Sequence, residues 1–182
     1  MEKVNRLRRL TEAGLIAAMY AALTVAVAPL AYGNFQFRIS EVLTILPVFT
    51  PSAIPGLTVG CFVANLFGLM SGTNPAGAWD LILGPLASLL AAVATYWLRN
   101  VRVKGIPVCA AIPAVVSNAV IVGAELANAY FDFTWAVYGI CALEVAVGEV
   151  VTATIGGLLL YGVLVKSGAA DRIFSKPYPT AG

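Results

Sequence analysis

Long apolar stretches, separated by short polar or charged connections, dominate the pattern of this chain. We expect transmembrane helices over residues 11–31, 40–50, 54–70, 78–98, 106–124 and 133–165, followed by a cytoplasmic tail over 166–182. The longer stretches approach the roughly 20 residues that an α-helix needs to cross the hydrocarbon core, and they lack the alternation of a β-barrel. Because lipid cannot satisfy backbone hydrogen bonds, the pattern predicts a single all-α transmembrane domain, residues 1–182.

Composition supports an integral membrane protein. Of the 182 residues, 60% are hydrophobic and 11% are charged, and the mean hydropathy is +0.88. Soluble domains carry about 25% charged residues. A cleaved signal peptide is the alternative for the N-terminal segment, because basic residues precede an apolar run that contains a small-residue motif at Ala26–Ala28. The run exceeds the usual apolar region of a signal peptide, about 7–15 residues, so a spanning helix is preferred.

The short, proline-containing stretch 40–54 decides whether five or six helices are expected. With six, both termini and the basic connection 99–104 lie on one side, and of the 11 Lys and Arg residues only Arg38 lies on the other. With five, the 99–104 connection would lie outside. The positive-inside rule therefore favours six helices with both termini in the cytoplasm.

On that topology, ionisable and amide side chains gather toward the outer side. They are Arg38, Glu41, Asn65, Asp80, Asn118 and Glu125. Since a buried charge without a partner costs several kcal/mol, the set predicts a polar cavity that opens to the outside. Hydrated loop ends are the alternative for each acid taken singly. We expect Arg38 to pair with Glu41 and to fix a loop that covers the pocket.

Each of two further pairs of residues has two possible roles. Glu144 and Glu149 lie within the long last segment and are about 140° apart around a helix, so one would face the cavity and the other a different surface. Trp79 and Trp135 adjoin acids near the outer side. They suit the stacking of a planar ligand, although an interfacial aromatic belt explains tryptophan there equally well.

Catalytic and metal chemistry have little support. The chain has no histidine, and its three cysteines, Cys61, Cys109 and Cys141, lie in apolar segments without Cys-x-x-Cys spacing, which predicts buried free thiols. It also has no Gly-x-x-x-x-Gly-Lys-Ser/Thr phosphate loop, so it is not its own ATPase by that route. An intramembrane enzyme that uses Glu144 and Glu149 is the remaining alternative, which their angular offset disfavours.

Small residues follow two neighbouring stripes on the first helix. Ala17 and Ala21 belong to one stripe, and Ala18 and Ala22 belong to the other. Small residues four positions apart let two helices approach closely in lipid. Packing inside the chain and contact with another subunit are both open.

Several motifs carry a family resemblance. They are the run Gln36–Pro47, the run Pro55–Asn65, Asp80 with Gly84, Asn118 with Val122–Glu125, and Gly148 with Glu149. Over about residues 13–165 the chain resembles the queuosine-precursor transporter family, QueT, whose members are substrate-binding S-components of energy-coupling-factor (ECF) transporters. Glu144 is not part of the family pattern.

The resemblance implies a six-helix solute receptor of the bacterial plasma membrane, with a pocket that faces outward. It implies partners, namely a transmembrane coupling subunit and two cytoplasmic ATPases that use the ATP, and it implies no cofactor on this chain and no nucleic-acid partner. In such receptors an Ala-x-x-x-Ala pattern on the first helix meets the coupling subunit. That pattern maps onto Ala17 and Ala21, or onto Ala18 and Ala22.

The resulting hypothesis is uptake of a 7-deazaguanine-type queuosine precursor. A carboxylate can accept both N–H donors of a guanine-like edge, and an amide can read its remaining groups. The candidates for the carboxylate are Glu41, Asp80 and Glu125, and those for the amide are Asn65 and Asn118. Another vitamin-like solute on the same fold is the alternative, because few side chains set specificity.

Overall fold

The computed structural model describes residues 2–28, 37–74 and 76–174 of the chain. Within these ranges the regular secondary structure is helical, apart from an isolated antiparallel bridge between Val103 and Ile106, and turns or irregular segments connect the helices. The elements are α1 (Glu2–Ala26), η1 (Ile39–Val48), α3 (Ala53–Met70), η2 (Gly77–Trp79), α4 (Asp80–Leu98), η3 (Val108–Ala111), α5 (Pro113–Tyr130), α6 (Trp135–Glu149), η4 (Val150–Gly156), α7 (Gly157–Lys166) and α8 (Ala169–Ile173). The predicted end of the first helix at residue 31, and the tail beyond 174, lie outside the described residues.

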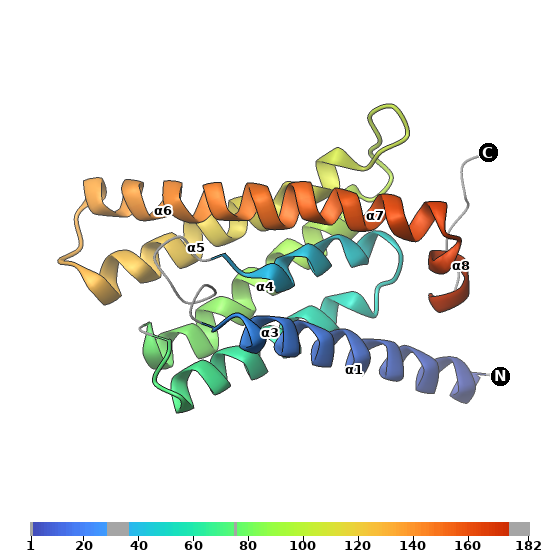
Figure 1. The fold of residues 1–182 in the computed structure, drawn as a ribbon, viewed down its shortest axis with the longest axis horizontal. Helices are drawn as coiled ribbons and strands as arrows, with labels where there is room; N and C mark the ends of the chain where they lie inside the picture. Colours follow the sequence, from blue (N-terminus) through green and yellow to red (C-terminus); the bar gives the residue numbers. More distant parts are fainter. Residues whose placement is uncertain (1, 29–36, 75, 175–182) are drawn as a thin grey trace.

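Among the described residues, five helices are long and apolar enough to cross a membrane. They are Asn5–Ala26, Ala53–Met70, Gly77–Leu98, Val108–Ala129 and Trp135–Lys166. The last is a continuous rod of α6, η4 and α7, in which η4 is π-helical (Figure 1). This agrees with the predicted all-helical membrane protein. Because α5 continues to Tyr130, Glu125 lies inside this helix and not at its end.

The segment that follows Arg38 forms a 3-10 helix, η1, and falls short of the five long spans. Eight of its ten residues are buried. Since a 3-10 helix rises about 2.0 Å per residue against 1.5 Å for an α-helix, η1 reaches about 20 Å. Figure 1 shows η1, in light blue, between α1 and the α6–α7 rod. Backbone that is not α-helical is tolerated at membrane depth where protein surrounds it, and the burial of η1 meets that condition.

The two alanine stripes of α1 have different surroundings. A Cβ added to Gly60 would lie 2.9 Å from the carbonyl oxygen of Ala17, so α1 and α3 touch along this stripe. Ala21 packs against a core that α1 and α3 share, with Tyr20, Leu57 and Cys61 among its buried members. In contrast, Ala18 and Ala22 are exposed. The first stripe is therefore used for packing inside the chain, and the second is open to a neighbour.

A second core joins α4, α5 and α6. Its buried members are Ala87, Val122, Leu126, Ala127, Cys141 and Val145. At Gly123 an added Cβ would lie 2.7 Å from the Cα of Ala142, which shows how closely α5 and α6 approach. The three cysteines are free, as predicted; Cys61 and Cys141 are buried and Cys109 is half-buried.

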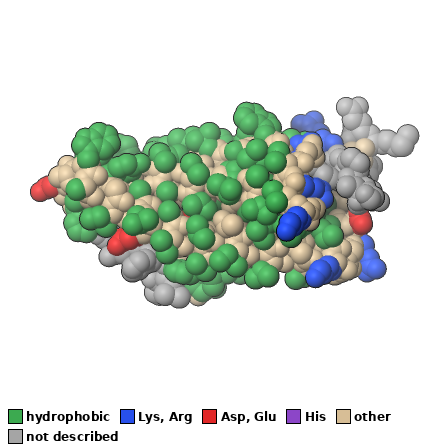
Figure 2. Space-filling model, turned by 90° about the horizontal axis from the view of Figure 1, so that it is seen from above, with side chains coloured by type: hydrophobic (Ala, Val, Ile, Leu, Met, Phe, Trp, Pro, Cys, Tyr) green, Lys and Arg blue, Asp and Glu red, His purple; other side chains and the backbone are tan. Residues whose placement is uncertain are grey.

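Basic side chains gather at one end of the molecule. Figure 2 shows Lys and Arg grouped there, and Figure 1 places the start of α1 and the helix α8 at the same end. Arg8 Nη2 donates to the carbonyl oxygen of Ile173 at 3.4 Å, which ties α8 to α1. Charge is thus distributed asymmetrically along the helix axes.

Candidate functional site

An ion pair between Arg38 and Asp80 lies within a buried polar cluster. Arg38 Nη2 is 3.1 Å from Asp80 Oδ2, and Asn74 Nδ2 donates to the same oxygen at 2.6 Å. Asn65 Nδ2 donates to the backbone carbonyl oxygen of Asp80 at 2.8 Å. The predicted ion pair between Arg38 and Glu41 is not the one that forms, because Arg38 extends across to the start of α4. Segments far apart in the sequence meet at Asp80.

Gly84 makes room for this arrangement. It follows Asp80 by one helical turn, and a Cβ added there would lie 2.3 Å from both Asn65 Nδ2 and Asp80 Oδ1. No side chain fits at that distance. The glycine therefore lets the side chains of α3 and α4 occupy the same space between the helices.

Glu41 is held by α1 from the other side. The Tyr20 hydroxyl donates to Glu41 Oε1, and one turn further along α1 the Thr24 hydroxyl donates to Ser40 Oγ at 2.7 Å. Thr44 Oγ1 donates to the backbone carbonyl oxygen of Glu41 at 2.6 Å. These bonds fix the first turn of η1 against α1, so the Glu41 carboxylate has a defined position.

The Glu149 carboxylate lies in the same region. Asn118 Nδ2 of α5 donates to Glu149 Oε1 at 2.6 Å, and the Asn118 amide also interacts with Glu41. Glu149 ends α6, directly before the π-helical turn η4. Such π-turns occur often at functional sites. Asn118 thus links two carboxylates that lie more than one hundred residues apart in the sequence.

Buried acceptor atoms without a hydrogen-bond partner concentrate on the acids and amides of this region. Among the described residues these side-chain atoms are Glu41 Oε2, Asn65 Oδ1, Asp80 Oδ1, both carboxylate oxygens of Glu125, and Glu149 Oε2, with Ser52 Oγ at a separate location near the start of α3. Native proteins leave few buried polar atoms unpaired, and each such atom calls for an explanation. A bound solute that donates hydrogen bonds would supply the missing partners.

A cleft of about 670 Å³ opens between α4 and α5. Its lining includes Trp79, which is 71% exposed, and Glu125, which is 5% exposed. The walls are otherwise mainly apolar, with Leu83, Val120 and Ile121 among them. The charges of Arg38 and Asp80 act on Glu125, so this cleft and the buried cluster share one electrostatic environment.

The structure leaves other sequence candidates away from the cluster. Trp135 is 80% exposed and packs edge-on against Phe133 and Tyr138. Of the two glutamates of α6, Glu149 is the buried one, whereas Glu144 is only half-buried. The 140° offset separates them as the helical geometry requires.

Two residues of the cluster carried no signal that sequence reasoning detected. Tyr20 lies within an apolar run, where an aromatic residue suggests core packing, yet its hydroxyl binds Glu41. Asn74 lies in the sequence Gly-Thr-Asn-Pro, a composition typical of turns, where asparagine is ordinary. Its side chain instead reaches Asp80.

The unpaired acceptor atoms of the site suit a ligand that donates hydrogen bonds. The carboxylates of the site offer open acceptors, while the one guanidinium of the cluster, Arg38, is paired with Asp80. No group of three or more His, Cys, Asp or Glu side chains that could hold a metal ion occurs in the described part of the chain.

Two comparisons with known proteins indicate the same family. A family model described as QueT transporter matches residues 10–166. The "Queuosine precursor transporter QueT" of Lactococcus lactis subsp. cremoris (strain MG1363) is 32% identical over 79 residues, which cover 42% of this chain and 42% of that protein. The match thus spans less than half the length of this curated relative. No solved structure matches the chain significantly. With its apolar spans, the chain is a multi-pass protein of the bacterial plasma membrane, and it belongs to the QueT transporter family.

Proposed function

We propose that this protein is the substrate-binding subunit of an importer for a queuosine precursor, a 7-deazaguanine-type base. The observation that carries the proposal is Glu125, a buried carboxylate with both oxygens unpaired, in a cleft that also contains an exposed indole. The printed name of the Lactococcus relative supports the same class of solute.

Glu125 is better suited than the other acids to read the base. A guanine-like edge presents two adjacent N–H donors, and a carboxylate accepts both only when its two oxygens are open. Asp80 already uses Oδ2 for Arg38 and Asn74, and Glu41 uses Oε1 for Tyr20. Both oxygens of Glu125 lack a hydrogen-bond partner. Trp79, in the same cleft, supplies a face on which a planar base stacks.

The remaining carboxylates favour a ligand that carries an amine. Glu41 and Glu149 each keep one oxygen without a partner, and Arg38 acts on both electrostatically. One guanidinium, already paired with Asp80, does not offset three further acids. An ammonium group on the solute would reduce the net negative charge of the site.

The topology that we propose has six crossings, with η1 as the second, and both termini in the cytoplasm. Its support is the basic end of the molecule, where α1 starts and α8 lies (Figure 2). Lys and Arg accumulate on the cytoplasmic side of membrane proteins. This orientation directs the α4–α5 cleft, at the opposite end of α4 from the basic connection 99–104, to the outside.

Energy for uptake would come from a separate ECF module of a transmembrane coupling subunit and two ATPases. The sequence has no phosphate loop of its own. Of the two alanine stripes, Ala18 and Ala22 are exposed and so fit a helix of the coupling subunit, whereas Ala17 already contacts α3. Close helix packing in lipid depends on such small residues.

Co-purification from the native host tests the coupling. We expect the tagged chain to bring down a coupling subunit and two ATPases, and the Ala18→Leu/Ala22→Leu variant to lose them while it still binds solute. The matched control is Ala136→Leu, which changes an exposed alanine in the first turn of α6, and this variant should retain the partners. Full retention by the double variant would exclude this stripe as the interface.

Calorimetric titration tests the solute class. The purified chain should bind 7-deazaguanine precursors and ignore flavins, thiamine and biotin. Absence of binding to every 7-deazaguanine tested, with the protein folded and monodisperse, would refute the proposed function.

A further inference from the structure

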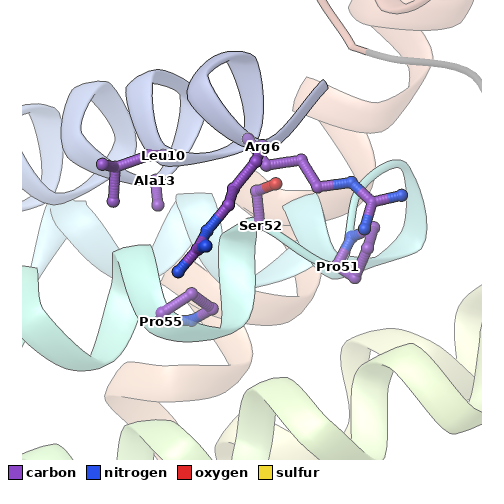
Figure 3. Close-up of a pocket in the computed structure, with 7 residues that line it drawn as sticks. Arg6, Leu10, Ala13, Pro51, Ser52 and Pro55 are labelled. Atoms are coloured by element: carbon purple, nitrogen blue, oxygen red, sulfur yellow. The ribbon is translucent and has the colours of Figure 1, made fainter. Parts of the chain in front are cut away.

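A second pocket, of about 410 Å³, lies at the basic end of the molecule between the first turns of α1 and the start of α3. Its lining consists of Arg6, Arg9, Leu10, Ala13, Pro51, Ser52 and Pro55. Figure 3 shows Arg6 on α1 above Ser52, Pro51 and Pro55 at the start of α3. The pocket is far along α1 from the polar cluster around Glu41, and the proposed transport function does not use it.

The polar groups of this pocket are all suited to an anion. Arg6 and Arg9 are three residues apart and so lie on neighbouring turns of one helix face, and both are exposed. Ser52 is 6% exposed, and its hydroxyl has no hydrogen-bond partner. It also occupies the N-cap of α3, where the helix dipole is positive. No acid is among the lining residues.

The hydroxyl and the guanidiniums, and not the backbone, supply the donors. The first amides of α3 are already used, since Ala53 N donates to Thr50 O at 3.2 Å and Ile54 N donates to Pro51 O at 3.1 Å. Glu12, the nearest acid along α1, is not among the lining residues, and its carboxylate contacts Arg8 at 3.4 Å and accepts from the Thr50 hydroxyl at 3.0 Å, whose oxygen in turn accepts from Ser52 N at 3.2 Å.

The apolar part of the pocket lining indicates that the anion belongs to a larger, partly apolar molecule. Leu10, Ala13, Pro51 and Pro55 are apolar, and Leu10 is 70% exposed. The pocket lies where the apolar span Asn5–Ala26 begins, which is the level of the lipid headgroups. A small soluble phosphate would leave the apolar walls unused, whereas a phospholipid covers them with its acyl chains.

We propose that this pocket binds the phosphate of an anionic phospholipid such as phosphatidylglycerol. Arg6, Arg9 and the Ser52 hydroxyl contact the phosphate oxygens, and the acyl chains pass along Leu10 and Pro55. A choline headgroup places a third cation next to the two guanidiniums, so phosphatidylcholine binds less well.

Native mass spectrometry of the full-length protein in detergent tests this, with dioleoylphosphatidylglycerol, dioleoylphosphatidylcholine and glycerol 3-phosphate as probes. We expect the anionic lipid to bind at least about tenfold more tightly than either other probe, the discrimination that about 1.4 kcal/mol provides. Arg6→Gln/Arg9→Gln should remove this preference. Ser52→Ala should weaken binding of the anionic lipid about 10- to 150-fold, because one hydrogen bond to a charged group, worth about 1.5–3 kcal/mol, is lost. Because its hydroxyl has no partner, Ser52→Ala should melt at the temperature of the lipid-free wild type.

The matched control is Lys166→Gln/Arg172→Gln, which removes two exposed charges from the same end but outside the pocket. This control should keep the preference for the anionic lipid within about twofold, because substitutions far from a site act independently of it. Equal loss in this control, or no loss in either arginine or serine variant, would overturn the assignment. So would glycerol 3-phosphate binding as tightly as the lipid, which indicates a soluble phosphate site. Loss of the coupling subunit from Arg6→Gln/Arg9→Gln, with lipid binding unchanged, would assign the pocket to that partner instead.

Discussion

Replacing Glu125 by glutamine separates the binding role of this residue from any structural one. The substitution keeps the shape of the side chain but changes one of its two open carboxylate oxygens into a donor. Because neither oxygen has a hydrogen-bond partner in the structure, no internal bond is lost. Solute binding and protein stability should therefore respond in opposite directions.

The magnitude follows from the number of hydrogen bonds. Glutamine still accepts one N–H of a guanine-like edge, but its amide opposes the other, so one charge-assisted bond is lost, at about 1.5–3 kcal/mol. At 1.4 kcal/mol per tenfold, the dissociation constant should rise about 10- to 150-fold. Removal of a buried carboxylate without a partner relieves a desolvation cost, so the melting temperature of the free protein should rise.

Calorimetry and a thermal melt of the same samples measure both quantities. Asp132→Asn, an exposed acid in the α5–α6 connection, is the matched control and should change neither. A 7-deazaguanine analogue without the 2-amino group should bind the wild type more weakly and show a smaller further loss with Glu125→Gln. Wild-type affinity in Glu125→Gln, or a lowered melting temperature, would refute the assignment of Glu125 as the reader of the base.

Two further substitutions test the frame around the site. Arg38→Met leaves Asp80 as a buried charge without its guanidinium partner and should destabilise the protein by about 3–5 kcal/mol in denaturant titration. The control Arg8→Gln breaks the half-exposed pair with Glu12 at 3.4 Å and should cost about 0–1 kcal/mol. Similar costs for the two variants would contradict the buried pairing. Gly84→Ala places a methyl group 2.3 Å from Asn65 Nδ2 and Asp80 Oδ1 and should lower both the melting temperature and the affinity for solute. The control Gly139→Ala, which has open space around its Cβ, should change the stability by at most about 1 kcal/mol. If Gly84→Ala changed neither the melting temperature nor the affinity, the two side chains would not depend on that gap.

Hydropathy and charge were sufficient to predict the class of fold. Long apolar runs have one physical solution in lipid, and the all-helical membrane protein follows from them. The stretch 40–50 was harder, because periodicity cannot distinguish an α-helix from the 3-10 helix that η1 adopts, and packing against neighbouring helices decides between them.

The candidate site was predictable as a set of residue types but not as a set of pairs. Intramembrane acids and asparagines are costly, and this marked Glu41, Asp80, Asn118 and Glu149 as functional candidates. The partners depend on the three-dimensional course of the chain. Arg38 therefore reaches Asp80 although Glu41 is three residues away.

Tyr20 shows the limit from the opposite direction. Its position on α1 fits a core residue, and only the packing of α1 against η1 in the structure reveals that its hydroxyl donates to Glu41. The alanine stripes were also symmetrical in sequence. Gly60 on α3, which admits Ala17, distinguishes the packed stripe from the exposed one.

A structure of the purified protein with a 7-deazaguanine precursor bound would test the central claim most directly. We predict that the base lies in the α4–α5 cleft, on the face of Trp79, with its two adjacent N–H groups within hydrogen-bonding distance of the Glu125 carboxylate. A base bound elsewhere in the molecule, with the Glu125 oxygens still unpaired, would contradict it.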